Sequence, residues 1–311
     1  MIETVRTWMA ALVLAAATAG AGEARVPPLV DAPWLADRLG TPGLVVLDIR
    51  NPFGGANRRT YESGHIPGAI YSNFLTDDWH DRGSPVPATL PPLAQLEDLL
   101  GRLGIGNDSL VVIVHSGTDS SDFSTAARVY WILKLLGHER MTILDGGFRA
   151  WEAAGLPVEQ GWNEPRRARF TAGPDRGILA DTRQVAQAPQ RGAMLLDARA
   201  RDYYEGRRNA PVVSRVGTLP GALNLEHRRL VDTQTGRFVG REALEALVAE
   251  TGIGADTEVI TFCNIGHWSA SVWFALSEIA GFEQVKLYDG SMAEWSAAPD
   301  RPVVIPAAAS R

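Results

Sequence analysis

The side chain best suited to covalent chemistry is the only cysteine of the chain, Cys263. It follows an apolar run from Val259 to Phe262, and an amphipathic stretch begins near Ser269, so the pattern places it between a buried strand and a helix. A helix N-terminus offers free N–H donors and a partial positive charge, and both favour a thiolate over a thiol. We therefore expect a nucleophile at the carboxyl end of a parallel strand, where open α/β sheets bind their ligands.

The residues between Cys263 and the predicted helix form the rest of the candidate site. Their N–H groups could turn toward the sulfur and hold an anion or the outer sulfur of a persulfide. Gly266 would permit a backbone turn that other residues resist, and Ser269 is placed to be the N-cap of the helix. The loop residues are Asn264, Ile265, Gly266, His267, Trp268 and Ser269.

The elements that must position this loop occur twice. "LVVLDIR" recurs as "AMLLDAR", "GHIPGAI" as "GTLPGAL", "VVIVHS" as "EVITFC" and "ILDGGFRAW" as "LYDGSMAEW". Each of these anchors returns after roughly 150 positions, which indicates a duplicated module. The aspartates that follow the strands, at positions 48, 145, 197 and 289, occur in both copies and are therefore interpreted as structural.

Each copy alternates short apolar runs with stretches of helical spacing that end on Gly. This alternation predicts an α/β fold with two domains, each a mainly parallel sheet with helices on both faces. Strands of the first copy are expected at 44–47, 110–114 and 142–144, and helices of the two copies at 90–105, 124–138, 240–253 and 269–282. The predicted boundaries are 25–160 and 177–311 for the domains and 161–176 for a polar linker.

The duplication also bears on whether Cys263 is a nucleophile or a buried filler, since free cysteines are often buried. In an alignment of the copies Ser116 takes its place, and the following loop, "GTDSSDF", is three residues longer and acidic. A slot that needed only a small side chain would not require two different loops, so a catalytic Cys263 is favoured. For Asp119 and Asp122, substrate selection and packing at an interface both stay open.

The anchors resemble the rhodanese module: an Asp that closes the first strand, the G-H-I-P-G-A turn, the strand before the cysteine and the D-G-G-x-x-x-W element. In tandem, with a cysteine only in the second copy, the chain is similar to two-domain thiosulfate and mercaptopyruvate sulfurtransferases over residues 27–305. The resemblance implies that Cys263 takes a sulfane sulfur from a small anionic donor and passes it to cyanide, a thiol or a protein acceptor. It implies no metal and no cofactor.

The sequence departs from this family around the substrate. The loop N-I-G-H-W matches neither the basic loop of thiosulfate-type enzymes nor the G-S-G-V-T-like loop of mercaptopyruvate-type enzymes. Tyr203 stands where the family has a substrate arginine, and Arg199 and Arg208 are the candidate substitutes, with Arg201 and Arg207 nearby. Thiosulfate is the expected donor because it is a stable anion available outside the cytoplasm, and mercaptopyruvate is the second choice.

Several alternatives stay open at this point. His267 could supply a pH-dependent positive charge, because a free imidazole has a pKa near 6.5, or it could bond to a neighbouring group. Trp268 could wall a pocket or pack on the core. A carrier that holds a persulfide without turnover would have the same loop. A phosphatase or arsenate reductase is disfavoured, because their C-x-x-x-x-x-R loop needs an arginine where this chain has Ser269.

Charge and the N-terminal sequence bear on partners and location. A net charge of −6 over 311 residues, with scattered arginines, indicates neither nucleic acid nor an anionic membrane as a partner. Residues 1–24 combine Arg6, an apolar stretch and A-x-A sites, the pattern of a secretory signal peptide. Because the apolar stretch is shorter than the roughly 20 residues that span a bilayer, an uncleaved anchor is disfavoured, although cleavage stays open, and a periplasmic or secreted protein is expected.

Overall fold

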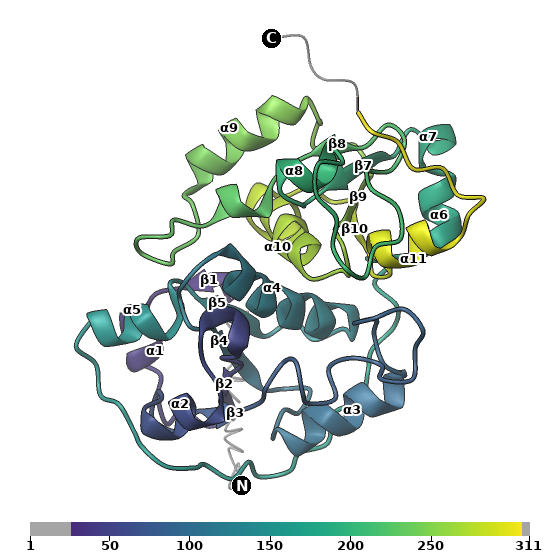
Figure 1. The fold of residues 1–311 in the computed structure, drawn as a ribbon. Helices are drawn as coiled ribbons and strands as arrows, with labels where there is room; N and C mark the ends of the chain where they lie inside the picture. The colour runs from purple at the N-terminus through teal and green to yellow at the C-terminus, as the bar shows by residue number, and fades with distance from the viewer. Residues whose placement is uncertain (1–25, 307–311) are drawn as a thin grey trace, which may run out of the picture.

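The computed structural model describes residues 26–306, which form two domains of the same design, the first purple to teal and the second green to yellow (Figure 1). Each domain holds a five-stranded sheet, with strand orders β1-β5-β4-β2-β3 and β6-β10-β9-β7-β8. Neighbouring strands in both sheets are parallel. The predicted α/β class with two parallel sheets is confirmed, and the predicted signal peptide lies outside the described residues.

The first domain matches the expected strands and adds two short ones. Its elements are β1 (Leu29–Val30), α1 (Ala32–Ala36), β2 (Leu44–Asp48), η1 (Pro52–Gly54), α2 (Arg58–Ser63), β3 (Ile70–Tyr71), α3 (Leu93–Arg102), β4 (Leu110–Val114), α4 (Ser120–Leu135), β5 (Met141–Leu144) and α5 (Gly147–Ala153). Helix α4 begins four residues before the predicted start, because the carboxylate of Asp119 caps it by accepting the N–H groups of Ser121 and Asp122.

The second domain repeats this order around β9. Its elements are β6 (Leu179–Ala180), α6 (Thr182–Ala186), α7 (Ala188–Arg191), β7 (Met194–Asp197), α8 (Arg201–Tyr204), β8 (Leu223–Asn224), η2 (His227–Leu230), α9 (Arg241–Thr251), β9 (Val259–Phe262), α10 (Trp268–Phe274), the π-helical η3 (Ala275–Ala280), β10 (Val285–Tyr288) and α11 (Ser291–Ala297). Strand β9 is the central strand of its sheet, so the residue after it lies at the middle of the carboxyl edge.

Helices cover both faces of each sheet. In the first domain, Leu47 and Ile113 belong to the same core as residues of α3 and α4, whereas the alternate residues Val46 and Val112 share a core with residues of α1, α2 and α5. The second domain divides in the same way, with α9 and α10 on one face and α6, α7 and α11 on the other. This two-sided burial is what a parallel sheet with apolar strands requires.

The domains meet through α4 and α10, which pack against each other and join one core that runs through both domains. The ring of Phe274 lies 5.7 Å from that of Phe123 and 5.1 Å from that of Tyr130, measured between centroids. Residues 161–176 contain no helix or strand and bond to the first domain, for example from Gly173 N–H to the carbonyl oxygen of Leu136. The predicted domain and linker boundaries stay a prediction.

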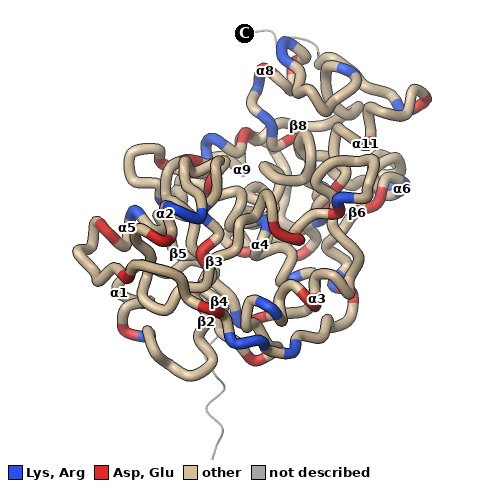
Figure 2. The backbone as a smooth tube through the Cα atoms, turned by 60° about the horizontal axis from the view of Figure 1, so that its bottom comes forward, with Lys and Arg blue, Asp and Glu red and all other residues tan. Residues whose placement is uncertain are grey.

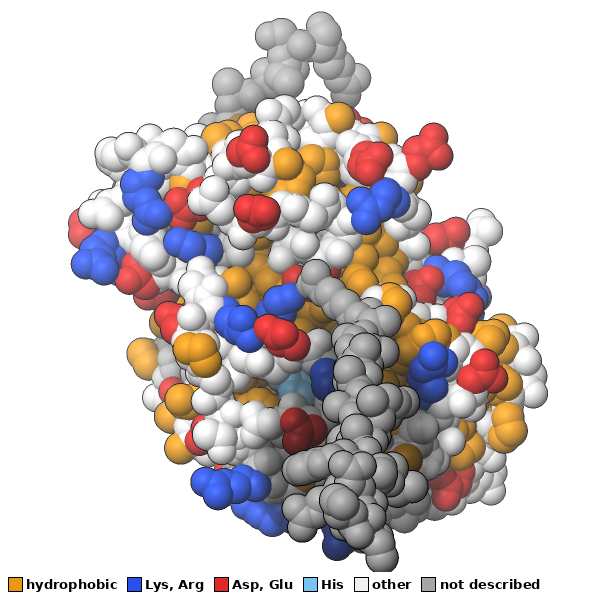
Figure 3. Space-filling view, turned by 180° about the vertical axis from the view of Figure 1, so that it is seen from behind, with side chains coloured by type: hydrophobic (Ala, Val, Ile, Leu, Met, Phe, Trp, Pro, Cys, Tyr) orange, Lys and Arg blue, Asp and Glu red, His pale blue; other side chains and the backbone are white. Residues whose placement is uncertain are grey.

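The surface carries both charge signs on both domains. Basic and acidic residues are interspersed along the backbone in Figure 2, with no basic stripe among residues 26–306. Figure 3, which views the molecule from behind Figure 1, shows hydrophobic side chains at the surface between scattered charged ones. Within the described part of the chain, no helix combines the length and the hydropathy that crossing a bilayer requires.

We expect the α4–α10 core to dominate stability. Ile132 of α4 is fully buried, whereas Ile305 is 61% exposed, so the two isoleucines form a matched pair. Ile132→Ala should lower the free energy of unfolding by about 2–5 kcal/mol, because it removes buried apolar surface and leaves a cavity. Ile305→Ala should change it by less than about 0.5 kcal/mol. Urea unfolding of both variants checks this, and equal losses would contradict the buried position of Ile132.

Candidate active site

Cys263 directly follows β9 and is 1% exposed. Its backbone is held on two sides, since its carbonyl oxygen accepts the N–H of Met292 at 3.1 Å and its own N–H donates to Ser291 Oγ at 3.0 Å. The hydroxyl of Ser269 lies 3.7 Å from Sγ and can donate to it. The thiol thus lies where the sequence predicted it, at the carboxyl end of a central parallel strand, with a hydroxyl donor directed at the sulfur.

Ser291 fixes the shape of the loop, and sequence reasoning missed it. Its hydroxyl accepts the N–H groups of Cys263 and Gly266, each at 3.0 Å, and donates to the carbonyl oxygen of Tyr288 at 2.9 Å. Ser291 has a φ of +50°, in the left-handed region, where the equivalent first-domain residue is Gly147 with a φ of +58°. The signal was available in the sequence, because "DGG" of the first copy becomes "DGS" in the second.

The structure corrects the alignment of the Cys263 loop with the equivalent loop of the first domain. Phe262 pairs with Asp197 as Val114 pairs with Asp48, so the residue equivalent to Cys263 is His115 and not Ser116. The backbone agrees, since the carbonyl oxygen of His115 accepts the N–H of Phe148 as that of Cys263 accepts the N–H of Met292. The following helices begin at equivalent positions, Ser120 and Trp268, so the first loop is not longer.

The first-domain loop is closed by its own anion. The buried carboxylate of Asp122 accepts the N–H groups of Ser116, Gly117 and Thr118 at 3.1, 2.7 and 3.1 Å, and it lies 2.9 Å from Nδ1 of His115. Burial alone would raise the pKa of Asp122, but the charge of His115 and these hydrogen bonds hold it below its usual value. Asp122 is therefore a structural residue that fills the loop, and Asp119 caps α4.

The second-domain loop lacks this anion. In the corrected alignment Ala270 takes the place of Asp122, and the residues equivalent to Ser116 and Gly117 are Asn264 and Ile265. Among residues 26–306, neither the N–H of Asn264 nor that of Ile265 has a hydrogen-bond partner. The same backbone that holds a carboxylate in the first domain is therefore available in the second domain to a negatively charged group next to Cys263.

The start of α10 corrects one prediction and decides between two alternatives. The residue at the N-cap position is His267, not Ser269, and its side chain makes no cap hydrogen bond; Ser269 lies in the first turn of the helix. Burial lowers the pKa of His267 to about 4, so the ring is neutral at pH 7, which favours the alternative that it bonds to a neighbouring group. Its Nε2 instead lies 2.9 Å from the carbonyl oxygen of Ser121 in α4.

Trp268 packs rather than walling the cavity. Its ring stacks on His227 with the centroids 4.5 Å apart and lies 6.0 Å from the ring of Tyr203. Its Nε1 donates to Ser121 Oγ at 3.1 Å. The first domain therefore holds both aromatic residues at the start of α10 through one serine.

The two candidate substrate arginines are engaged elsewhere. Arg199 is 1% exposed, and its guanidinium bonds to Asp197 and to the carbonyl oxygen of Gly217, as Arg50 bonds to Asp48 and Gly64 in the first domain. Because both copies share this arrangement, Arg199 is a structural residue. Arg208 lies over the ring of Tyr203 at 4.7 Å and 3.6 Å from Asp202, on the surface.

The cation that does contact the loop comes from the first domain, and sequence reasoning missed it. Arg128 of α4 is buried, pairs with Asp289 and lies 3.5 Å from the carbonyl oxygen of Gly266. The other carboxylate oxygen of Asp289 accepts the N–H of Leu90 at 2.7 Å. Its first-domain equivalent, Asp145, accepts the N–H of Phe238 across the interface at 2.8 Å. These aspartates therefore tie each domain to the other.

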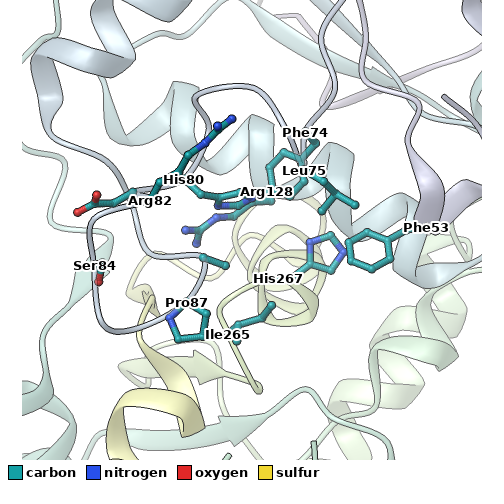
Figure 4. Close-up of a pocket in the computed structure, with 12 residues that line it drawn as sticks. Phe53, Phe74, Leu75, His80, Arg82, Ser84, Pro87, Arg128, Ile265 and His267 are labelled. Atoms are coloured by element: carbon teal, nitrogen blue, oxygen red, sulfur yellow. The ribbon is translucent and has the colours of Figure 1, made fainter. Parts of the chain in front are cut away.

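A cavity of about 380 Å³ lies between the domains at this loop (Figure 4). The second domain contributes Ile265 and His267, and the first domain contributes the remaining walls. The lining residues are Phe53, Phe74, Leu75, His80, Asp81, Arg82, Ser84, Pro87, Ala88, Arg128, Ile265 and His267. In the described residues no three His, Cys, Asp or Glu side chains come together as a metal site.

The chain is similar to known proteins over most of its length. The rhodanese-like domain model matches residues 31–154 and 181–298. Thiosulfate sulfurtransferase of Cricetulus griseus is 32% identical, covering 86% of this chain and 91% of that protein. The 3-mercaptopyruvate sulfurtransferase of Escherichia coli is 30% identical, covering 88% and 96%. The crystal structure of SseA from Escherichia coli, a 3-mercaptopyruvate sulfotransferase, matches with a TM-score of 0.73 at 29% identity, covering 86% and 99%.

We expect Ser291→Ala to destabilise the protein by about 1–3 kcal/mol, because it leaves the buried N–H groups of Cys263 and Gly266 without an acceptor. Ser63→Ala is the control, since that serine is exposed and its hydroxyl donates to the exposed carbonyl oxygen of Thr60, with no other hydroxyl partner in the described residues. Urea unfolding of both variants measures the difference. Equal stabilities would show that the Ser291 hydroxyl does not hold the loop.

The buried imidazole of His227 predicts a pH dependence of stability. Burial lowers the pKa of His227 in the folded protein to about 3, whereas it is about 6.5 in the unfolded chain. Between these two pH values only the unfolded chain binds the proton, so stability is lost as the pH falls below 6.5. His227→Phe keeps a ring against Trp268 but removes this proton. Between pH 6.5 and 4.5, the wild type should lose about 2 kcal/mol more than the variant in urea unfolding. Parallel losses would rule out a neutral His227.

Proposed function

Because the chain belongs to the tandem rhodanese-like sulfurtransferase family, we propose that Cys263 carries a sulfane sulfur as a persulfide between a small donor and a cyanide or thiol acceptor. The donor we propose is thiosulfate. The Cys263 thiolate attacks the sulfane sulfur, the S–S bond of thiosulfate breaks, and its electron pair leaves on sulfite. Cyanide or a thiolate then attacks the outer sulfur, and Sγ departs as a thiolate.

The observation that carries this proposal is the difference between the two equivalent loops. The first loop places Asp122 on three of its own N–H groups, whereas the second has Ala270 at that position and a cysteine beside the available N–H groups. N–H groups that hold a carboxylate in one copy are suited to the negative outer sulfur of a persulfide in the other. Ser269, with its hydroxyl 3.7 Å from Sγ, adds a donor to the sulfur itself.

The chemistry of the loop favours thiosulfate as the donor. One relative is a thiosulfate sulfurtransferase and another a 3-mercaptopyruvate sulfurtransferase, at similar identity. Thiosulfate is a small dianion without a carboxylate, and the loop N–H groups next to Cys263 can donate to its negative atoms. Mercaptopyruvate also presents a carboxylate, for which an arginine would be suited, and both Arg128, which contacts the loop, and Arg199 are already paired with carboxylates.

The intact mass of the purified protein tests this function. Thiosulfate should add the mass of one sulfur to the wild type and none to Cys263→Ser, and cyanide should remove it with repeated release of thiocyanate. An adduct without turnover would favour a persulfide carrier. Loading by 3-mercaptopyruvate but not by thiosulfate would reassign the donor. If neither donor nor polysulfide adds sulfur, the persulfide proposal fails.

We also propose that the protein acts outside the cytoplasm, on the basis of the signal-like residues 1–24. Expression of the full chain in a bacterial host should yield a periplasmic protein whose mass lacks these residues. A cytoplasmic protein that retains Met1 or starts at Ile2 would contradict export.

A further inference from the structure

The cavity at the cysteine loop is walled by a row of four rings. Phe53 lies 4.8 Å from His267, His267 lies 5.7 Å from Phe74, and Phe74 lies 4.6 Å from His80, all between centroids. Phe53 is 43% exposed and Leu75 is 38% exposed, so the mouth of the cavity is apolar as well. Figure 4 shows the Phe53 and His267 rings side by side, with Ile265 below them. Such walls favour a planar or apolar organic molecule.

The hydrogen bond from His267 to Ser121 fixes which ring nitrogen carries the proton. A carbonyl oxygen can only accept, so Nε2, 2.9 Å from the oxygen of Ser121, must be the N–H. Because the ring is neutral, Nδ1 then holds a lone pair. His267 is only 6% exposed, and its Nδ1 is buried without a hydrogen-bond partner among residues 26–306. A buried acceptor without a donor is costly, and a ligand N–H or O–H would relieve this cost.

His80 repeats this situation on the other side of Phe74. Its Nδ1 is also buried without a partner in the described part of the chain. Burial, together with the charge of Arg128, lowers its pKa to about 4, so this ring is neutral as well. The cavity therefore offers two neutral imidazoles, one from each domain, between apolar rings.

The cavity has little attraction for an anion. Arg128 is paired with Asp289, and the guanidinium of Arg82 bonds to the carbonyl oxygen of Thr76. Asp81 lines the same cavity as Arg82, so the lining carries both charge signs. An oxyanion would bring only lone pairs to the lone pair of His267 Nδ1, whereas a molecule with an N–H or O–H would complement it.

We propose that this cavity binds the sulfur acceptor, and that the acceptor is an uncharged organic thiol with a planar or apolar body and an N–H or O–H that donates to His267 Nδ1. The proposal rests on the proposed transfer through Cys263. The sulfur of the acceptor thiol attacks the negatively charged outer sulfur of the Cys263 persulfide and forms a new S–S bond. The bond to Sγ breaks with its electron pair on Sγ, the proton of the acceptor thiol passes to Sγ, the negative charge stays on the transferred sulfur, and no oxidant is required.

Three aryl thiols of similar size test the recognition. 4-Aminothiophenol has an N–H donor, 4-methylthiophenol has none, and 4-mercaptobenzoate carries an anion. With the Cys263 persulfide formed first and its loss followed by mass, the amino thiol should react about tenfold faster than the methyl thiol, the value of one hydrogen bond. The benzoate should be the slowest. Equal rates for the amino and methyl thiols, or a preference for the benzoate, would overturn the proposal.

Two variants locate the recognition. His267→Gln can keep the N–H donated to Ser121 but lacks the acceptor at Nδ1, so the rate ratio of the amino thiol to the methyl thiol should fall to about 1. Because both thiols are compared on the same loaded variant, this ratio does not depend on how fast the variant forms its persulfide. His138→Gln is the matched control, because His138 also has a buried Nδ1 without a partner in the described residues but lies outside the cavity. A preference that survives in His267→Gln, or that is lost in His138→Gln, would contradict the assignment.

A binding measurement separates this proposal from the proposed function. 4-Methylaniline keeps the ring and the N–H but has no thiol, and it can be titrated into Cys263→Ser while the ¹⁵N resonances of the histidines are recorded. A shift at His267 Nδ1 on binding supports the acceptor site even if thiosulfate does not load Cys263. Saturating 4-methylaniline without a change at His267 would overturn the proposal even if the persulfide forms.

Discussion

The packing of α4 against α10 is the constraint on which the candidate site depends. Helix α10 begins at Trp268, five residues after Cys263, so anything that positions α10 also positions the loop. Helix α4 supplies Ser121, which bonds to His267 and Trp268, and Arg128, which contacts Gly266 and Asp289. The first domain lacks a cysteine, yet it holds the loop of the second domain in place.

The two copies show how one backbone can serve two purposes. Both loops present N–H groups after a central strand, and both meet the helix that follows at the same position. In the first copy, the buried carboxylate of Asp122 accepts those N–H groups, so that loop is closed by a side chain of its own domain. In the second copy, the same donors have no such carboxylate, and Ser291 bonds to only part of the loop. The difference between a structural loop and a candidate catalytic loop is thus the presence of an internal anion.

Sequence patterns captured the parts of the molecule that depend on local order. The apolar runs predicted the central strands, the repeat predicted two sheets of one design, and the lone thiol was correctly placed after β9. The two-residue strands β1, β3, β6 and β8 were not predicted because they are too short to show a period. The sequence alignment of the two copies placed Ser116 opposite Cys263, one residue away from the true equivalent His115, because apolar runs define a strand but not its register.

The remaining errors concern residues whose surroundings come from far along the chain. His267 is neutral because the first domain buries it, with Phe53 and Phe74 against its ring, and no local pattern contains that information. Arg128 contacts Gly266 from a position 138 residues away in sequence. The sequence pattern therefore points to Arg199, which lies close to the strand-end motif, and not to Arg128. The partners of Arg199, Asp197 and Gly217, are nearby in sequence and structural.

These placements together change what the site can recognise. An unpaired arginine beside the loop would select substrates by charge, but Arg128, which contacts the loop, is paired with Asp289, and Arg199 is paired with Asp197. The apolar rings and the unpartnered imidazole nitrogens of the cavity instead favour discrimination by shape and by hydrogen bonds. A buried imidazole whose proton is committed to a backbone oxygen is a directional acceptor that does not change state between pH 6 and 8. Recognition built in this way would be insensitive to salt, because it depends on no exposed charge.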